Sequence, residues 1–283
     1  MHPSQPESNR TYVLGSSPHE FDRLIRQGQA LESMTRRLFE EAGIRPGTNV
    51  LDLGSGSGDV ALLLSQLVGP SGSVTSIDVD PAAIELSQAR AAAAGVANIS
   101  FVQADISQLA LDTSYDAIVG RYIFLYLADP GLTLARLAKR LRPGGPGGSG
   151  GPGGIVAFLE PWLTLPQGPP NPLQQVAVTI METMKCSGAR IDQGVRLHHV
   201  FREAGLPQPQ MRYEGVLDPS EDSPLHQLFA DSYLSLLPAA EKYGMVSPDA
   251  LDPAVLPQLL RMAMSAAGYA TMMFPTVCAW SRK

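Results

Sequence analysis

The sequence predicts an α/β fold in which helices cover both faces of a doubly wound, mostly parallel sheet. Short apolar segments alternate with segments of helical periodicity from residue 49 to residue 160. A glycine-rich turn follows the first apolar segment and opens a helix. Acidic residues stand at the ends of the first three apolar segments, on the side where a parallel sheet binds its ligands. Helices between strands are the crossover connections that parallel strands require.

The alternating part begins after one long helix. Apolar residues at helical spacing predict that helix over residues 21–42, and Gly43 ends it. Proline is favoured at the first position of a helix, which suits a later helix that begins at Pro81. The expected strands are 49–53, 73–78, 99–103, 115–120 and 155–160, and the helices between them are 60–68, 81–94 and 130–141.

Residues 143–154 interrupt the pattern with glycines, prolines and one serine. Because such residues offer almost nothing to pack, we expect a flexible surface loop inside the domain. Beyond this loop, helices become more frequent than strands. We expect helices at 173–184, 192–204, 225–237 and 253–267, and strands at 211–217 and 276–281.

Composition restricts the classes of function. The chain has 283 residues, of which 44% are hydrophobic and 17% charged, so it can bury a sizeable core. The net charge of −6 and the scattered basic residues leave no basic stripe for a nucleic acid. Cys186 and Cys278 form no CxxC pair, which excludes a disulfide framework, predicts no metal site and fits a cytoplasmic compartment.

Two segments bear on membranes. The first seven residues contain no apolar stretch of the kind that a signal peptide carries. The uncharged run 262–280 is long enough to span a bilayer, but Gly268, Pro275 and several polar residues interrupt it. We therefore expect a helix followed by a strand there, and no membrane partner.

The segment with the sharpest chemical meaning is Asp-Leu-Gly-Ser-Gly-Ser-Gly-Asp at residues 52–59. Glycines at alternate positions let the main chain turn sharply and let a ligand lie against it. The spacing is G-x-G-x-G, but Gly56, Gly58 and Ala61 also fit the dinucleotide fingerprint G-x-G-x-x-G/A. Glycine spacing alone thus leaves several cofactors open, as well as a turn that binds no ligand.

Three acidic residues narrow the choice. Asp52 stands just before the glycines, Asp78 ends the second strand, and Asp105 follows the third. A carboxylate in the second position can accept both ribose hydroxyls, and one in the third could accept the amine of an adenine. Each acid alone is typical of a helix cap or a turn. Together they line the carboxyl edge of a parallel sheet, where such folds bind ligands.

In these residues the sequence resembles the class I S-adenosylmethionine-dependent methyltransferases. The resemblance rests on five segments, 50–58, 77–78, 104–105, 115–119 and 141–145, and extends from about residue 45 to residue 160. It implies a Rossmann-like sheet of seven strands with an antiparallel last strand, here 276–281. It also implies S-adenosyl-L-methionine as the cofactor and methyl transfer as the reaction.

The resemblance assigns roles to individual residues. The glycine loop lies under the methionine and ribose parts of the cofactor, Asp78 holds the ribose, and Asp105 and Ile106 frame the adenine. Tyr12, Arg23 and Gln27, near the N-terminus, are expected to close over the cofactor. The full set expected to bind it is Tyr12, Arg23, Gln27, Asp52, Gly54, Ser55, Gly56, Asp59, Asp78, Val79, Asp105, Ile106, Gly120 and Arg121.

The chain departs from this family in two places. The loop at 143–154 is extended, and a long, mostly helical stretch separates the last two strands. We interpret residues 1–44 as an N-terminal helical cap, 45–283 as the methyltransferase domain, and 220–272 as a helical lid inserted before the last strand. The alternative is that the added helices only extend the edge of the sheet.

A small-molecule metabolite is the expected acceptor, with oxygen favoured over nitrogen or carbon. No Asn-Pro-Pro-Tyr-type motif follows the fourth strand, so methylation of adenine or amide nitrogen in macromolecules lacks support. Aromatic residues at 122–126 could line an apolar pocket or belong to the core. Two other functions stay open: a fold relative that binds S-adenosylmethionine without methyl transfer, and an NAD-dependent oxidoreductase, for which no Tyr-x-x-x-Lys site is present.

An oxygen acceptor would usually need a general base. His198 and His199 are adjacent on the expected helix 192–204, so at most one of them points into a site. His198 lies closer to the apolar face and is expected to be the buried one, as a base or as a core residue. Arg121 and Tyr122, beside the expected methyl donor, are the rival candidates for contact with the substrate. The sequence leaves the oligomeric state open.

Overall fold

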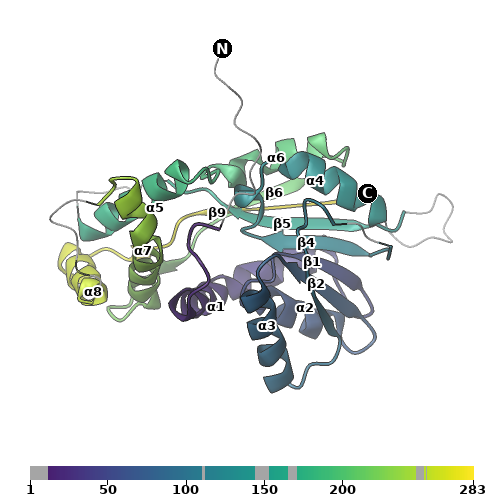
Figure 1. The fold of residues 1–283 in the computed structure, drawn as a ribbon, viewed down its shortest axis with the longest axis horizontal. Helices are drawn as coiled ribbons and strands as arrows, with labels where there is room; N and C mark the ends of the chain where they lie inside the picture. Colours follow the sequence, from purple (N-terminus) through teal and green to yellow (C-terminus); the bar gives the residue numbers. More distant parts are fainter. Residues whose placement is uncertain (1–11, 110–111, 144–152, 165–170, 247–251, 253) are drawn as a thin grey trace, which may run out of the picture.

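The computed structural model describes residues 12–109, 112–143, 153–164, 171–246, 252 and 254–283. Its main sheet has seven strands in the order β3-β2-β1-β4-β5-β9-β6 (Figure 1). The strands are β1 (Asn49–Leu53), β2 (Ser73–Asp78), β3 (Ile99–Gln103), β4 (Ala117–Arg121), β5 (Ile155–Pro161), β6 (Gln210–Glu214) and β9 (Thr276–Arg282). Strands β1 to β5 pair in parallel, and β9 is antiparallel to both of its neighbours. The predicted doubly wound, mostly parallel, seven-stranded sheet is confirmed.

The central strands are apolar along almost their whole length. β1, β4 and β5 lie between other strands and have helices on both faces, so nearly all of their residues are buried. The register pairs Leu53 of β1 with Ile77 of β2 and with Gly120 of β4. These three strands therefore end level with one another, and the loops that follow them meet at one edge of the sheet.

Helices cover the two faces of the sheet. Those on one face are α1 (Pro18–Ala42), α2 (Asp59–Val68) and α3 (Pro81–Ala93), and those on the other are α4 (Pro130–Leu137) and α6 (Gln193–Glu203) (Figure 1). Side chains alternate along β5 and so serve both cores. Ala157 belongs to the core under α1 and α2, whereas Phe158 stacks on Phe124, with ring centroids 4.1 Å apart, under α4 and α6.

Helix α1 starts three residues before the position that the sequence predicted. The Ser17 hydroxyl caps it by accepting a hydrogen bond from the Glu20 amide at 3.1 Å, and Pro18 takes the first helical position. Gly43, with φ of 97°, ends the helix as expected. The earlier start places Glu20 in the first turn, where it becomes part of the candidate site.

Three further helices form a layer beyond the carboxyl ends of the strands (Figure 1). They are α5 (Pro172–Cys186), α7 (Pro224–Lys242) and α8 (Leu256–Ala267). Their apolar faces meet in one cluster, which also includes Leu125 and Leu163. α7 and α8 are inserted between β7 (Leu217–Asp218) and β8 (Thr271–Met272), which pair as a two-stranded ribbon.

Two expected boundaries in this second half are wrong. The strand expected at 211–217 is split at Gly215 into β6 and β7. α7 continues through Pro238, although a proline usually stops the helix before it. Pro238 lies on the exposed side, and the buried Leu236 and Ala240 anchor the turns on either side of it. Burial on that face therefore outweighs the lost hydrogen bond.

The helix expected at 130–141 also ends early. α4 stops at Leu137 and continues as a short 3-10 turn, Ala138–Arg140, after which Leu141 makes an isolated bridge to Tyr115. That bridge replaces the start of the strand expected from residue 115. The glycine- and proline-rich loop predicted at 143–154 falls mostly outside the described residues.

None of the helices in the described ranges is long and apolar enough to cross a membrane. No group of three or more His, Cys, Asp or Glu side chains in these ranges is placed to hold a metal ion.

Candidate functional site

A large cavity opens at the carboxyl edge of strands β1 to β4. Its volume is about 1570 Å³, more than the roughly 300–1,000 Å³ of a pocket for one drug-sized ligand. The lining comes from the N-terminal segment and α1, the glycine loop, the ends of β2 and β3, the segment after β4, and helices α5 and α7. The cavity therefore has room for a cofactor and a second molecule together.

The glycine loop turns its main chain toward this cavity. Gly54, Gly56 and Gly58 have φ values of 80°, 52° and 82°, a conformation that residues with a Cβ avoid. The Gly56 amide donates to Asp78 Oδ2 at 2.8 Å, which ties the loop to β2. A Cβ placed on Gly56 would have Leu24 of α1 as its nearest neighbour, at 3.7 Å. The space over this glycine is thus open to a ligand that lies against the main chain.

Asp78 lines the cavity at the end of β2. Its Oδ2 accepts the Gly56 amide, and its Oδ1 accepts the Asp80 amide at 3.0 Å. Burial raises the pKa of Asp78, while the backbone N–H groups lower it. A carboxylate has about four lone-pair sites, so Asp78 retains acceptors for hydroxyl groups of a ligand.

Asp105 occupies the corresponding place after β3. Its Oδ1 accepts the Ser107 amide at 2.8 Å, and its carboxylate lines the cavity. Val79 and Ile106, which follow the two acids directly, line the same stretch, as do Ser55 and the other predicted members of the glycine loop. This end of the cavity combines two carboxylates with an apolar wall.

Three residues expected to bind the cofactor stand behind the lining instead: Asp52, Asp59 and Gly120. Asp52 is fully buried, and its Oδ2 accepts from Ser76 Oγ at 2.6 Å, while its Oδ1 has no partner among the described residues. Burial raises the pKa of Asp52 to about 7, against the lowering effects of Ser76 and Arg121. Asp52 is thus tied to β2 through Ser76 and does not line the cavity.

The other two act through packing. Asp59 forms an ion pair with Arg90 at 3.0 Å, and its carboxyl group fills the space next to Gly28 of α1. A Cβ on Gly120 would lie 2.7 Å from Phe158, so glycine there lets β4 pack closely on its neighbour. Asp52, Asp59 and Gly120 thus lie behind the cavity lining, and their contact with the cofactor stays a prediction.

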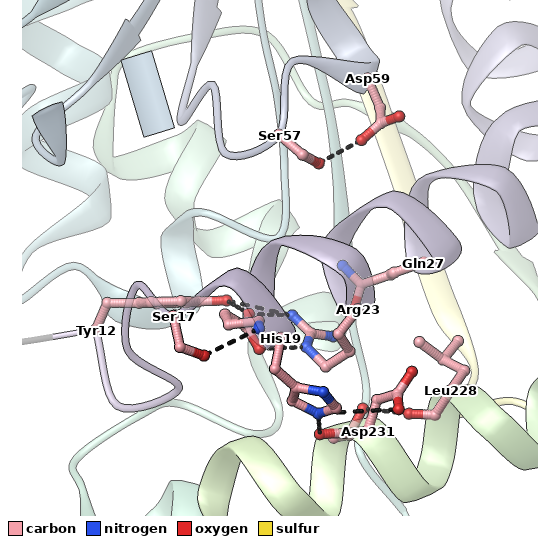
Figure 2. A network of polar contacts seen from close by, with 11 residues as sticks. Tyr12, Ser17, His19, Arg23, Gln27, Ser57, Asp59, Leu228 and Asp231 are labelled. Atoms are coloured by element: carbon pink, nitrogen blue, oxygen red, sulfur yellow. Dashed lines mark hydrogen bonds and ion pairs between the residues drawn. The ribbon is translucent and has the colours of Figure 1, made fainter. Parts of the chain in front are cut away.

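A network of polar side chains closes the cavity on the side of α1 (Figure 2). Arg23 is buried and donates two hydrogen bonds of 2.7 Å to the Glu20 carboxylate. It also donates to Gln27 Oε1 at 2.8 Å, and the Tyr12 hydroxyl donates to Glu20 Oε1 at 2.8 Å. Tyr12, Arg23 and Gln27 line the cavity, whereas Glu20 lies behind them.

Glu20 was not among the residues predicted from the sequence. A fully buried carboxylate is costly unless it is paired, and Arg23 and Tyr12 pair this one. The available signal was its spacing, because Glu20 stands three residues after Ser17 and three before Arg23. In a helix that spacing places the cap, the acid and the arginine along one side.

The segment after β4 forms the middle of the cavity. Arg121 lines it and donates to Thr35 Oγ1 on α1 at 3.3 Å. Tyr122 has φ of 55°, the one positive value for a non-glycine residue within the described ranges. Its hydroxyl lies 2.6 Å from Thr276 Oγ1 on β9, and burial raises the pKa of the phenol. Both predicted substrate-contacting residues of this segment therefore face the cavity.

The far end of the cavity, beside α5 and α7, is apolar. Phe229 and Phe274 meet there edge to face, with ring centroids 5.4 Å apart. Ser232 and Tyr126 add hydroxyl groups to an otherwise hydrocarbon wall. The apolar lining consists of Leu125, Leu163, Ile180, Met184, Phe229, Leu236, Met273 and Phe274. We call this part the acceptor end, and the part around Asp78 and Asp105 the cofactor end.

His198 lies outside the cavity, and the prediction that it is buried is wrong. It is exposed on α6, whereas His199 is half-buried and pairs with Glu203 at 3.0 Å. The physical reason is the packing of α4, because a Cβ on Gly131 would lie 2.4 Å from the Glu203 side chain. That contact covers the edge of α6 that carries His199 and leaves His198 to solvent.

Residues 44–146 match a family model described as a methyltransferase domain. The matched region contains the glycine loop, the acids at the three strand ends and the segment after β4. Residues 44–146 form a methyltransferase domain, and most of the chain shares the fold of a solved methyltransferase. S-adenosylmethionine is the cofactor of such domains, which resolves the choice that glycine spacing alone left open.

Named proteins are similar to this chain in sequence or in fold. A ubiquinone/menaquinone biosynthesis C-methyltransferase, UbiE, from Pseudomonas putida is 34% identical over 112 residues, which are 39% of this chain and 44% of that protein. The match thus spans less than half of that relative. Among solved structures, a methyltransferase of Bacillus halodurans named as putative has a TM-score of 0.56 at 14% identity, over 89% of this chain and 99% of that chain.

Coclaurine N-methyltransferase bound to N-methylheliamine and S-adenosylhomocysteine has a TM-score of 0.54 at 13% identity, over 89% of this chain and 72% of that one. At such identities the likeness is one of fold. It extends through the helices beyond residue 146, which the family model does not cover.

Proposed function

We propose that this protein transfers the methyl group of S-adenosylmethionine to an apolar small molecule. The observation that carries the proposal is a single cavity with two chemically different ends. Carboxylates and a glycine loop line one end, hydrocarbon side chains line the other, and Arg121 and Tyr122 lie between them. A transfer reaction needs two ligands held end to end in one site, from which water is excluded.

The residues at the cofactor end fit S-adenosylmethionine. The open space over Gly56 suits a ligand laid against the loop, and Asp78 has free lone pairs for ribose hydroxyls. Asp105 and Ile106 suit an adenine ring, with its amine toward the carboxylate. Arg23, which lines the side next to α1, suits the carboxylate of the methionine part. When bound, the cofactor supplies an electrophilic methyl group on a sulfonium.

The acceptor end suits an apolar or aromatic body that loses its water on binding. The preference for an oxygen acceptor, which the sequence suggested, has no support in this site. The candidate base for such chemistry, His198, is exposed on the other side of α6, and a relative of part of this chain is named as a C-methyltransferase. Oxygen, carbon and nitrogen acceptors are therefore to be tested side by side. A small-molecule partner and a cytoplasmic location belong to the same proposal.

Helices α7 and α8 are proposed to act as a lid, with α1 as the cap on the opposite side. Contacts between α1 and α7 support this proposal (Figure 2). Arg26 Nη1 donates to Asp231 Oδ2 at 2.6 Å, and His19 Nε2 lies 3.3 Å from the Asp231 carbonyl. Asp231 is buried between these helices. Since α1 borders the cofactor end and α7 the acceptor end, this contact would close both ends together.

The test compares binding and turnover on the purified protein. Calorimetry should detect binding of S-adenosylmethionine and none of NAD. Incubation with a panel of apolar phenols, quinols and amines should release S-adenosylhomocysteine, and mass spectrometry should find one acceptor heavier by a CH₂ group. Binding without turnover across the panel would favour a fold relative that does not transfer methyl groups. Binding of NAD in place of S-adenosylmethionine would favour an oxidoreductase.

A further inference from the structure

Glu160, at the end of β5, is a fully buried carboxylate that lies behind the cavity lining. Its Oε1 accepts the Ile123 and Phe124 amides, both at 2.8 Å, and its Oε2 accepts the Leu125 amide at 3.2 Å. One side chain thus holds three successive N–H groups of the segment that follows β4. Burial raises the pKa of Glu160 to about 8, and these three amides lower it.

The three amides come directly after Tyr122, the residue with the strained main chain. The Tyr122 amide donates to the Leu159 carbonyl at 2.8 Å, so the chain leaves the sheet at this residue. A left-handed conformation in a residue with a side chain persists only where its surroundings hold it. Leu159 on one side of the turn and Glu160 on the other provide that support.

The segment that Glu160 holds shapes the cavity from its middle to the acceptor end. Tyr122, Ile123, Leu125 and Tyr126 all line it. The Tyr122 ring packs against both the core under α1 and the cluster of α5, α7 and α8. The two carboxylates of the cofactor end stand at and just after the ends of β2 and β3. The segment touches that end only at its margin, where Ile123 packs on Gly54 and the Tyr126 ring meets Tyr12 with centroids 5.0 Å apart. A change at Glu160 should therefore affect the acceptor end more than the cofactor end.

Glu160 itself is held firmly. A Cβ on Gly194 of α6 would lie 2.8 Å from the Glu160 carbonyl, so α6 packs directly against this strand end. A buried carboxylate is an expensive way to satisfy three amides unless its geometry matters. A hydrophobic side chain at this position would leave the amides without that acceptor.

We propose that Glu160 is a positioning residue for the acceptor: it fixes the segment 122–126 in the shape that receives the acceptor, without touching either ligand. The proposal takes the meaning of the acceptor end from the proposed function. Its test rests on binding and amide exchange, which do not require turnover.

The test uses Glu160→Ala and Glu160→Gln with two probes. S-adenosylhomocysteine reports on the cofactor end, and 1,4-dimethoxynaphthalene, a neutral aromatic compound without an ionisable group, reports on the acceptor end. In Glu160→Ala we expect about tenfold weaker binding of dimethoxynaphthalene, at most about twofold weaker binding of S-adenosylhomocysteine, and faster hydrogen exchange at the amides of residues 123–125. Glu160→Gln keeps one oxygen for two of these amides and should recover part of the loss.

Val68→Ala is the control for general loss of stability. Val68 is buried at the opposite edge of the sheet, where its carbonyl accepts the Gly47 amide. Equal weakening of both probes in Glu160→Ala, or the same split in Val68→Ala, would overturn the proposal. So would unchanged binding of dimethoxynaphthalene together with faster exchange of the three amides. Wild-type protein that binds both probes but never releases S-adenosylhomocysteine would contradict the proposed function alone.

Discussion

The two ends of the cavity are built by different means. At the cofactor end, the polar groups are carboxylates at strand ends and the main chain of a glycine loop, all fixed by the register of β1, β2 and β3. At the acceptor end, most of the lining consists of side chains from α5, α7 and the segment before β9, with Leu125 and Leu163 from the segments after β4 and β5. The family match ends at residue 146, before these helices begin. The cofactor end is thus fixed mainly by the sheet, whereas the acceptor end is formed mostly by helices outside the matched region.

The largest effect is expected at the loop. Gly56→Val should weaken S-adenosylhomocysteine binding at least about 100-fold, because the new side chain occupies the cofactor space and the left-handed φ of 52° costs about 1–2 kcal/mol. Calorimetry measures the change. Gly95→Val is the matched control, since its φ is 67° and a Cβ there meets nothing within 4 Å. If both variants lose affinity equally, backbone strain and not cofactor space explains the result.

A smaller effect at the same end is expected for Asp78→Ala. Loss of hydrogen bonds to a charged group should weaken S-adenosylhomocysteine binding by about 1.5–3 kcal/mol, whereas dimethoxynaphthalene should bind as before. Ser73→Ala at the exposed start of the same strand is the control. Unchanged affinity in Asp78→Ala would show that this carboxylate does not hold the ribose.

The difference between the two ends also explains which features the sequence could predict. Alternating strands, the glycine turn and the acids are local patterns, and their order fixes one sheet edge. The exposure of His198 depends on where α4 packs against α6, and the spacing of residues within α6 does not indicate this. Glu160 looked like an ordinary strand end, because its three amides belong to a segment some 35 residues earlier in the chain. The acceptor end likewise arises from tertiary packing.

At the acceptor end, Phe274→Ala should reverse the pattern of Asp78→Ala. Removing a ring that packs against Phe229 should weaken dimethoxynaphthalene binding by about 1.5–3 kcal/mol, with S-adenosylhomocysteine unaffected. Val178→Ala on the exposed side of α5 is the control. Fluorescence titration with dimethoxynaphthalene measures the affinity of both variants for this probe. A loss of cofactor affinity in Phe274→Ala would mean that the two ends are not independent.

The contact between α1 and α7 tests whether the ends are coupled. Arg26→Gln removes the charge that pairs with the buried Asp231, and both probes should bind about fivefold more weakly, as expected for about 1 kcal/mol from a half-exposed pair. Arg36→Gln, which removes an exposed pair with Glu32 on the same helix, is the control. Wild-type affinities in Arg26→Gln would show that this pair does not close the cavity.

The smallest effect on binding is expected behind the glycine loop, at Asp52, where the measurable change is in stability. The pKa of Asp52 is about 7 in the folded protein, raised by burial from 3.8. Between these values the folded protein keeps a proton that the unfolded chain has lost. The free energy of unfolding therefore falls as the pH rises from about 4 to about 7, with a contribution of up to about 1.4 kcal/mol per pH unit, and levels off above that.

Asp52→Asn removes this dependence and keeps an oxygen for the Ser76 hydroxyl. Urea unfolding at pH 4.5, 6 and 8 should show the variant gaining stability relative to the wild type as the pH rises, with similar affinity for S-adenosylhomocysteine throughout. Glu160 titrates over an overlapping range in both proteins, so its contribution cancels in the difference. A constant difference across pH would mean that Asp52 stays ionised, with Arg121 nearby to balance it. Loss of cofactor affinity in the variant would instead return Asp52 to the binding site.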